Sequence, residues 1–215
     1  MSEASPLLKA LAIGKQFPGV RALHDVNLTL FQGEVLSLVG ENGAGKSTMM
    51  KILAGIHLPD EGAIELDGDF VEISNVREAQ KYGIALIHQE LNLSDNLDIA
   101  ANIFLGNEPH KSGIIDRNRI HKESAQFLKR VGLEFSTDTL VADLTIGHQQ
   151  LVEISKALSV DARIIIMDEP TSSLSQKESE KLFEVIQDLK SQGISIIYIS
   201  HRLGEVINLS DRVVV

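Results

Sequence analysis

The chain has 215 residues, 43% of them hydrophobic, which is enough to bury the core of one α/β domain or of a domain with a smaller lobe. It has no cysteine, which excludes disulfides and thiolate metal sites. Its formal net charge of -10 disfavours a broad surface for polyanions, so no nucleic-acid partner is expected. The longest apolar runs fall short of the roughly 20 residues that cross a bilayer, and the first residues carry no export signal.

The first part of the chain predicts an antiparallel sheet. Residues 7–39 predict short apolar strands separated by turns at 17–19 and 31–33. Residues 62–68 predict a further strand that ends in an Asp-Gly turn. We expect this sheet to lie beside a nucleotide site, because the phosphate loop described next follows directly.

A glycine-rich segment joins a strand expected at 34–39 to a helix expected at 46–56. Its glycines allow backbone N–H groups to point inward at a phosphate, and the helix N-terminus favours the anion. Lys46 can reach the β- and γ-phosphates, and the Ser47 hydroxyl can bind Mg²⁺. An ordinary glycine turn is the alternative, but the flanking strand and helix favour a phosphate loop. The predicted ATP-binding residues of the loop are Gly40, Glu41, Asn42, Gly43, Ala44, Gly45, Lys46, Ser47 and Thr48.

The middle of the chain predicts helices. A strand at 84–87 precedes Gln89, and helical patterns follow at 98–105, 119–131 and 147–158. Residues 90–160 are therefore expected to form a helical lobe.

The last part returns to parallel strands. The apolar run 164–167 ends in Asp168 and Glu169, the pattern of a buried strand whose carboxyl end reaches a ligand crevice. Asp168 would then hold Mg²⁺, and Glu169 would orient or deprotonate the attacking water. Acids at a strand end are weak evidence alone, but together with the phosphate loop they predict Mg-ATP binding and hydrolysis.

A long amphipathic helix is expected at 176–191, closed by Gly193, and a strand at 194–199 would bring His201 to the same crevice. The chain ends within an apolar run, which suggests an interrupted strand and a longer parent polypeptide. The expected fold is α/β: a P-loop NTPase core with a mainly parallel sheet, an antiparallel β subdomain and a helical lobe.

Five motifs in order make the chain resemble the ATP-binding cassette ATPases of ABC transporters along essentially its whole length: the phosphate loop, Gln89, the segment 143–151, the acid pair and His201. Within that superfamily the segments 15–23, 102–106, 169–174 and 200–203 are similar to monosaccharide importers of the ribose, galactose and xylose type. Polypeptides of that group carry two cassettes. The resemblance thus implies one nucleotide-binding domain over 1–215, the amino-terminal cassette, shortened at its C-terminus.

The resemblance also implies roles for single residues. Phe17 would stack on adenine, although an aromatic residue before Pro-Gly can equally pack a turn. Gln89 would contact Mg²⁺ or the attacking water. His201 would hydrogen-bond the γ-phosphate and hold Glu169 in position. The expected catalytic residues are therefore Glu169, His201, Gln89 and Lys46.

In the family, a signature loop completes the ATP site of an opposing cassette through its N–H groups and helix N-terminus. Here Ile146 and His148 replace the usual glycine and glutamine, and Ser175 replaces an aspartate that crosses the dimer. The residues of this chain that match the signature loop are Leu144, Thr145, Ile146, Gly147, His148 and Gln149.

The favoured function is an ATP-hydrolysing subunit that energises a membrane importer, with ATP and Mg²⁺ as cofactors. Its expected partners are a second cassette, a transmembrane permease and, indirectly, a substrate-binding protein, at the cytoplasmic face of the membrane. The alternative is a non-hydrolysing regulatory half, suggested by the altered signature and Ser175. A third hypothesis is a cassette ATPase that acts on DNA or ribosomes. That class would carry a long heptad insertion or a basic arm, and the sequence has neither, so this hypothesis is disfavoured. Kinases and switch GTPases are also disfavoured, because those classes of P-loop protein give no reason for the segment 144–150.

Overall fold

The computed structural model describes residues 5–41 and 43–215, so Asn42 of the phosphate loop lies outside the described residues. The chain divides into two compact units. Within the described residues the first unit comprises 5–86, 162–169 and 187–215, and the second comprises 87–161 and 170–186.

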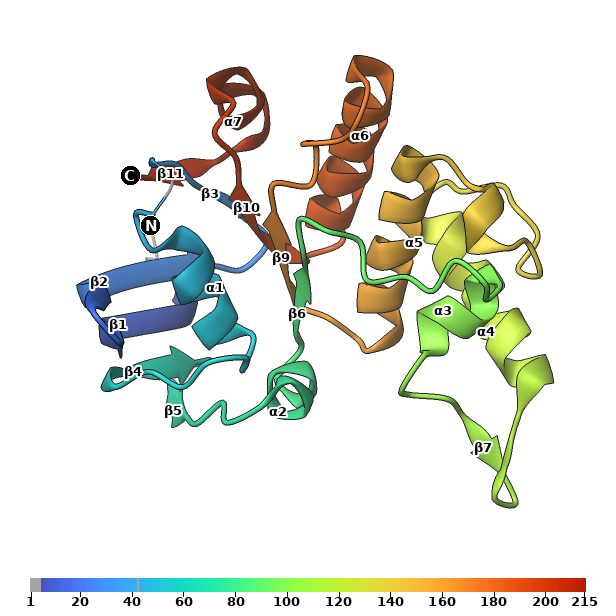
Figure 1. Ribbon diagram of the computed structural model, residues 1–215, viewed down its shortest axis with the longest axis horizontal. Helices are drawn as coiled ribbons and strands as arrows, with labels where there is room; N and C mark the ends of the chain where they lie inside the picture. The colour runs from blue at the N-terminus through green and yellow to red at the C-terminus, as the bar shows by residue number, and fades with distance from the viewer. Residues whose placement is uncertain (1–4, 42) are drawn as a thin grey trace. The chain divides into compact units, whose positions relative to one another are not determined.

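A five-stranded sheet forms the centre of the first unit, in the order β11-β3-β10-β9-β6 (Figure 1). β10 is parallel to both β3 and β9, and its Ile199 lies beside Leu38 on one side and Asp168 on the other. The carboxyl ends of these three strands are therefore level. The mainly parallel sheet predicted from the apolar runs is confirmed. Its strands are β3 (Val35–Leu38), β6 (Ile84–Ile87), β9 (Ile164–Asp168), β10 (Ser195–Ile199) and β11 (Arg212–Val214).

The second sheet of this unit is antiparallel, in the order β2-β1-β4-β5. The predicted turn after Phe17 joins β1 to β2, and the Asp-Gly turn joins β4 to β5 with Asp67 and Gly68 both at positive φ. The strands are β1 (Pro6–Phe17), β2 (Val20–Phe31), β4 (Glu61–Leu66) and β5 (Asp69–Val71).

The prediction of short strands in this region was wrong, because β1 and β2 each have 12 residues. Their pairing shifts register several times, and Ala12 and Asp25 adopt positive φ at these irregularities. A bulge shifts the alternation of side chains by one residue, so a single bent strand reads in sequence as several short ones.

Helix α1 (Lys46–Leu53) contributes Met49, Met50, Ile52 and Leu53 to a core that also contains residues of both sheets. The helix was expected to reach residue 56, but the chain turns at Gly55, which has φ of +72°. A Cβ there would lie 2.4 Å from the carbonyl oxygen of Asn75, so the turn requires glycine. Two short helices of this unit had no counterpart among the predicted elements, namely α2 (Val76–Lys81) and α7 (Leu203–Leu209).

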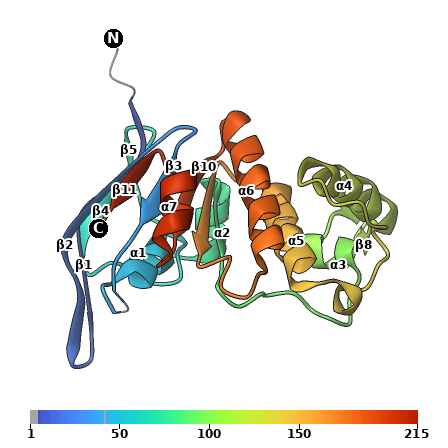
Figure 2. The same ribbon diagram turned by 90° about the horizontal axis from the view of Figure 1, so that it is seen from above.

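The second unit is mainly helical, and Figures 1 and 2 show α3, α4 and α5 gathered together. The three predicted helices are confirmed, with ends within two residues. Asp98, Asp116 and Thr145 cap them through their side chains. The unit also takes residues 170–186, which the sequence pattern did not suggest. Its elements are α3 (Ile99–Phe104), the hairpin β7 (His110–Lys111) and β8 (Ile114–Ile115), α4 (Arg117–Arg130), the 3-10 turn Val141–Asp143, α5 (Ile146–Ser159) and the first part of α6 (Gln176–Ser191).

Within the described part of the chain, no helix combines the length and apolar character that a membrane span requires.

Candidate functional site

The glycine-rich loop leads from β3 into α1 and adopts a conformation that ordinary residues avoid. Gly43 and Gly45 have φ of +89° and +90°. A Cβ on Gly45 would also lie 2.6 Å from the carbonyl oxygen of Ala22 and 2.7 Å from Leu23 Cδ2. Gly45 is therefore required both by its backbone angle and by its neighbours.

The Lys46 ammonium lies over the loop that precedes it. Its Nζ donates hydrogen bonds to the carbonyl oxygens of Gly40 at 2.7 Å and Glu41 at 3.0 Å. The N-cap of α1 is Gly45, and no described side chain caps the helix. The first-turn N–H groups and the ammonium thus form one electropositive region, which fits a phosphate group.

The acid pair lies at the level carboxyl end of the parallel sheet. Asp168 is the last residue of β9, and the Glu169 N–H donates to the carbonyl oxygen of Ile199 at 3.0 Å. Glu169 has φ of +47°, a left-handed conformation that is costly for a residue with a side chain. Strained residues of this kind cluster at functional sites. The left-handed backbone at Glu169 also turns its side chain away from the direction that strand alternation would give.

His201 and Glu169 lie within contact distance of each other, an arrangement that the resemblance to the cassette ATPases implied, and the catalytic role of the pair stays a prediction. The Nδ1 atom of His201 lies 3.2 Å from Glu169 Oε1, and the glutamate side chain is 18% exposed against 59% for the histidine. The half-buried carboxylate therefore has one exposed imidazole within hydrogen-bond distance.

Sequence reasoning missed Glu205, which fixes the segment that carries His201. Tyr198 Oη and Ser200 Oγ donate to Glu205 Oε2 at 2.9 and 2.8 Å, and Arg202 Nη1 donates to Oε1 at 3.2 Å. These donors come from β10 and from the residues on either side of His201. Glu205 is 9% exposed. On a helical pattern alone it reads as a solvated residue, and only the fold brings Tyr198 to it.

Tyr198→Phe tests this network. We expect a loss of about 1–2 kcal/mol in the free energy of unfolding, because the buried Glu205 carboxylate loses a donor. Tyr82→Phe is the matched control, since no hydrogen bond of its hydroxyl is found among the described contacts. Urea unfolding measures both variants, and equal stability losses would contradict the role of Glu205.

Phe17 is held at the end of β1 by its surroundings. Its ring meets the His57 ring edge-on at 5.4 Å, and Lys15 Nζ lies 5.7 Å from the ring centroid. Asp60 accepts hydrogen bonds from Lys15 Nζ and from the Gln16 N–H, both at 2.7 Å, which hold the pKa of the carboxyl below its ordinary value. Stacking of Phe17 on adenine stays a prediction.

Ser47 and Thr48 lie in the first turn of α1, whereas Gln89 and the signature residues lie in the second unit. Gln89 is exposed in a bend directly after β6. Thr145 caps α5 by accepting a hydrogen bond from the His148 N–H at 3.3 Å, and the His148 ring lies edge-on to Phe135 at 4.9 Å. Gln149 Nε2 donates to the carbonyl oxygen of Val141 at 3.1 Å. Leu144 and Thr145 thus lead into α5, and Ile146, Gly147, His148 and Gln149 lie in its first turn, which agrees with the predicted loop before a helix. His148 has an aromatic neighbour.

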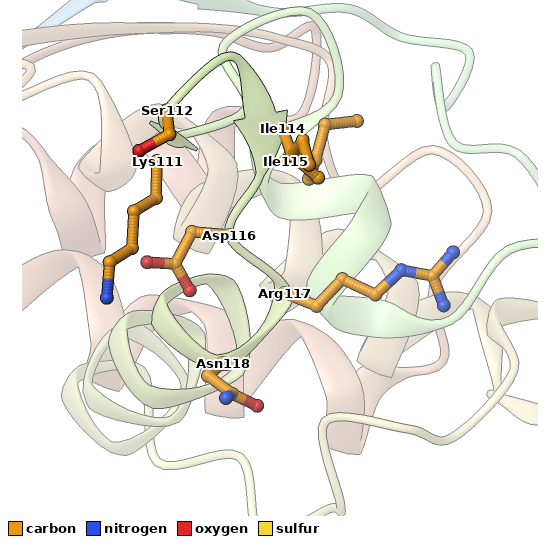
Figure 3. A pocket seen from close by; sticks show the side chains of 7 residues that line it. All are labelled: Lys111, Ser112, Ile114, Ile115, Asp116, Arg117 and Asn118. Atoms are coloured by element: carbon orange, nitrogen blue, oxygen red, sulfur yellow. The ribbon is translucent and has the colours of Figure 1, made fainter.

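A surface hollow of this unit lies at the β7–β8 hairpin and the start of α4 (Figure 3). The Asp116 carboxylate caps α4 by accepting from the Arg119 N–H at 3.0 Å, and Figure 3 shows the Arg117 guanidinium pointing away from it. The other residues that line the hollow are Lys111, Ser112, Ile114, Ile115 and Asn118.

A glycine-rich loop with its lysine at a helix N-terminus, together with an acid pair at the carboxyl end of another strand of the same parallel sheet, defines a P-loop nucleotide-binding protein. The family model described as ABC transporter matches residues 23–172, and the chain belongs to this family. The α/β fold with its mainly parallel sheet, antiparallel sheet and helices is that of an ATP-binding cassette.

Relatives among curated proteins extend this result. The chain is 48% identical over 215 residues to the ribose import ATP-binding protein RbsA of Clostridium perfringens, covering 99% of this chain and 43% of that protein. It is 51% identical over 211 residues to the protein of the same name from Caldanaerobacter subterraneus, covering 98% and 42%. It is 49% identical over 212 residues to a putative ribose/galactose/methyl galactoside import ATP-binding protein of Burkholderia ambifaria, covering 99% and 41%. The chain therefore spans about two-fifths of the length of these relatives.

Solved structures agree. A nucleotide-free ATP-binding cassette from an ABC transporter superposes with a TM-score of 0.87 at 26% identity, covering 96% of this chain and 86% of that one. The dimeric structure of MJ0796, a bacterial ABC transporter cassette, gives a TM-score of 0.81 at 26% identity, covering 96% and 93%.

Proposed function

We propose that the chain is the ATP-binding and ATP-hydrolysing cassette of a membrane importer, with a monosaccharide as the transported solute. The observation that supports hydrolysis best is the pairing of a strained, half-buried Glu169 with His201 at 3.2 Å. The names of the relatives, which are ribose and galactose import ATP-binding proteins, support the solute class.

The proposed chemistry assigns each residue one task. Lys46 would move its ammonium from the loop carbonyls to the β- and γ-phosphates, and the N–H groups of residues 43–48 would cradle the anion. Ser47, Asp168 and Gln89 would supply the hard oxygen ligands that Mg²⁺ prefers, and a bound Mg²⁺ would neutralise phosphate charge. Phe17 would stack on the adenine.

Glu169 would orient or deprotonate the attacking water. His201 would hold that carboxylate in place through Nδ1 and offer its remaining ring nitrogen to the γ-phosphate. The signature turn at the start of α5 would meet the ATP of an opposing cassette, so that ATP binding closes the pair and hydrolysis opens it.

We further propose that the chain is the amino-terminal cassette of a two-cassette polypeptide, which agrees with its coverage of 41–43% of the relatives. A second cassette and a transmembrane permease would be its direct partners, and a substrate-binding protein an indirect one. The helical unit would pass the closing motion to the permease at the cytoplasmic face of the membrane.

The deciding experiment is the steady-state Mg-ATPase rate per chain, measured against chain concentration with Glu169→Gln as the blank. We expect the rate per chain to climb with concentration and to vanish in the blank, because each site needs the signature loop of another copy. A rate that is zero at every concentration while ATP still binds would mean either that hydrolysis needs the second cassette or that the chain is the regulatory alternative.

A further inference from the structure

Glu178 forms a capping box with Ser175 at the start of α6. The Ser175 N–H and hydroxyl donate to Glu178 Oε2 at 3.0 and 2.7 Å, and Ser175 Oγ accepts from the Glu178 N–H at 3.3 Å. This reciprocal pattern is a common way to begin a helix and needs only one carboxylate oxygen.

The other carboxylate oxygen leaves α6 and reaches the first turn of α5. Thr145 Oγ1 donates to Glu178 Oε1 at 3.1 Å, and the Gly147 N–H lies close enough to this carboxylate to lower its pKa. A Cβ on Gly147 would lie 2.6 Å from the same oxygen, so the close approach depends on glycine. The hydrogen bonds of Ser175, together with those of Thr145 and Gly147, hold the pKa of Glu178 below its ordinary value.

The proposed function places the signature residues against the ATP of an opposing cassette, and Thr145 and Gly147 are two of those residues. Thr145 would offer its hydroxyl, and Gly147 its N–H, to the γ-phosphate of an opposing cassette. A carboxylate and a γ-phosphate are both anions and cannot share one hydroxyl and one N–H group at full strength.

We propose that Glu178 occupies the γ-phosphate position of the signature turn in the unpaired chain, and that cassette pairing requires the phosphate to displace it. This inference rests on the proposed function. It makes Glu178 a positioning residue that sets the ATP concentration at which two cassettes close. Ser175, which stands where the family usually has a cross-dimer aspartate, would keep its hydrogen bonds to the displaced carboxylate.

The test compares self-association in Mg-ATP by sedimentation velocity, with Glu169→Gln as the background so that ATP persists. Glu178→Gln removes the anion and keeps the shape of the side chain. Glu180→Gln is the matched control, because it removes the same charge from an exposed position of α6 where Glu180 accepts a hydrogen bond only from Gln176 Nε2 among the described contacts.

We expect Glu178→Gln to pair about tenfold more tightly than the background, because a like-charge contact is removed. Glu180→Gln is expected to pair as the background does. Equal effects of the two substitutions would reduce the result to net charge and overturn the proposal. Weaker pairing of Glu178→Gln would also overturn it, since the carboxylate would then support the closed state.

If none of the three chains pairs, a phosphate titration observed at the Gly147 amide tests the proposal instead. Inorganic phosphate is titrated while the amide resonance is followed by nuclear magnetic resonance. A shift at lower phosphate concentration in Glu178→Gln than in the background and in Glu180→Gln supports the proposal. The same response in all three, or no response in any, overturns it. Mg-ATP binding at Lys46 is measured in parallel, and its absence would refute the proposed function without affecting the phosphate titration.

Discussion

Glu169→Gln is expected to lower the ATP turnover rate by about 10²- to 10⁴-fold while Mg-ATP still binds. An amide cannot accept the proton of the attacking water, but it keeps the size of the side chain and can accept a hydrogen bond from His201. Glu169 has φ of +47° in the parent chain, and because Gln and Glu have similar backbone preferences we expect the strain to be the same in the variant, so that the difference in rate reports on chemistry. Single-turnover hydrolysis and equilibrium binding of ATP are the two measurements.

Glu180→Gln provides the comparison for this prediction as well, because it changes the net charge equally at an exposed position. Its turnover is expected to equal that of the parent chain. Normal turnover in Glu169→Gln would refute the assignment of Glu169 as the base.

Lys46→Ala is expected to weaken Mg-ATP binding by about 100-fold or more. The ammonium makes two hydrogen bonds to the loop, and in the proposed complex it exchanges them for charge-assisted bonds to phosphate oxygens, each of which contributes about 1.5–3 kcal/mol. A ligand that binds only the folded chain raises its melting temperature, so thermal unfolding with and without Mg-ATP measures the loss.

Lys51→Ala removes the same charge from the last turn of α1, away from the loop. Its stabilisation by Mg-ATP is expected to match that of the parent. If Lys46→Ala were stabilised as strongly as Lys51→Ala, the anion would not bind at the start of α1.

The local elements were largely predictable, and the exceptions have physical causes. The bounds of α6 agree with its apolar spacing, and β9 and β10 follow from uninterrupted apolar runs, because strands buried on both faces need no polar alternation. The lengths of β1 and β2 were not predictable, since a bulge interrupts the alternation that marks a strand. Helix α7 has few residues and little periodicity, and it forms because β10 and Glu205 support it.

The site divides in the same way. By itself the sequence determined the phosphate loop, the acid pair and their order, because these motifs act through backbone shape and charge within a few residues of chain. Only the tertiary structure decided which distant side chains meet. It brought His201 to Glu169 through the level ends of β9 and β10, and it placed Glu205 behind His201. It also brought the Glu178 carboxylate of α6 into contact with Thr145 at the start of α5, although the two residues are 33 positions apart in the sequence. The packing of the two helices decides which donors a carboxylate reaches.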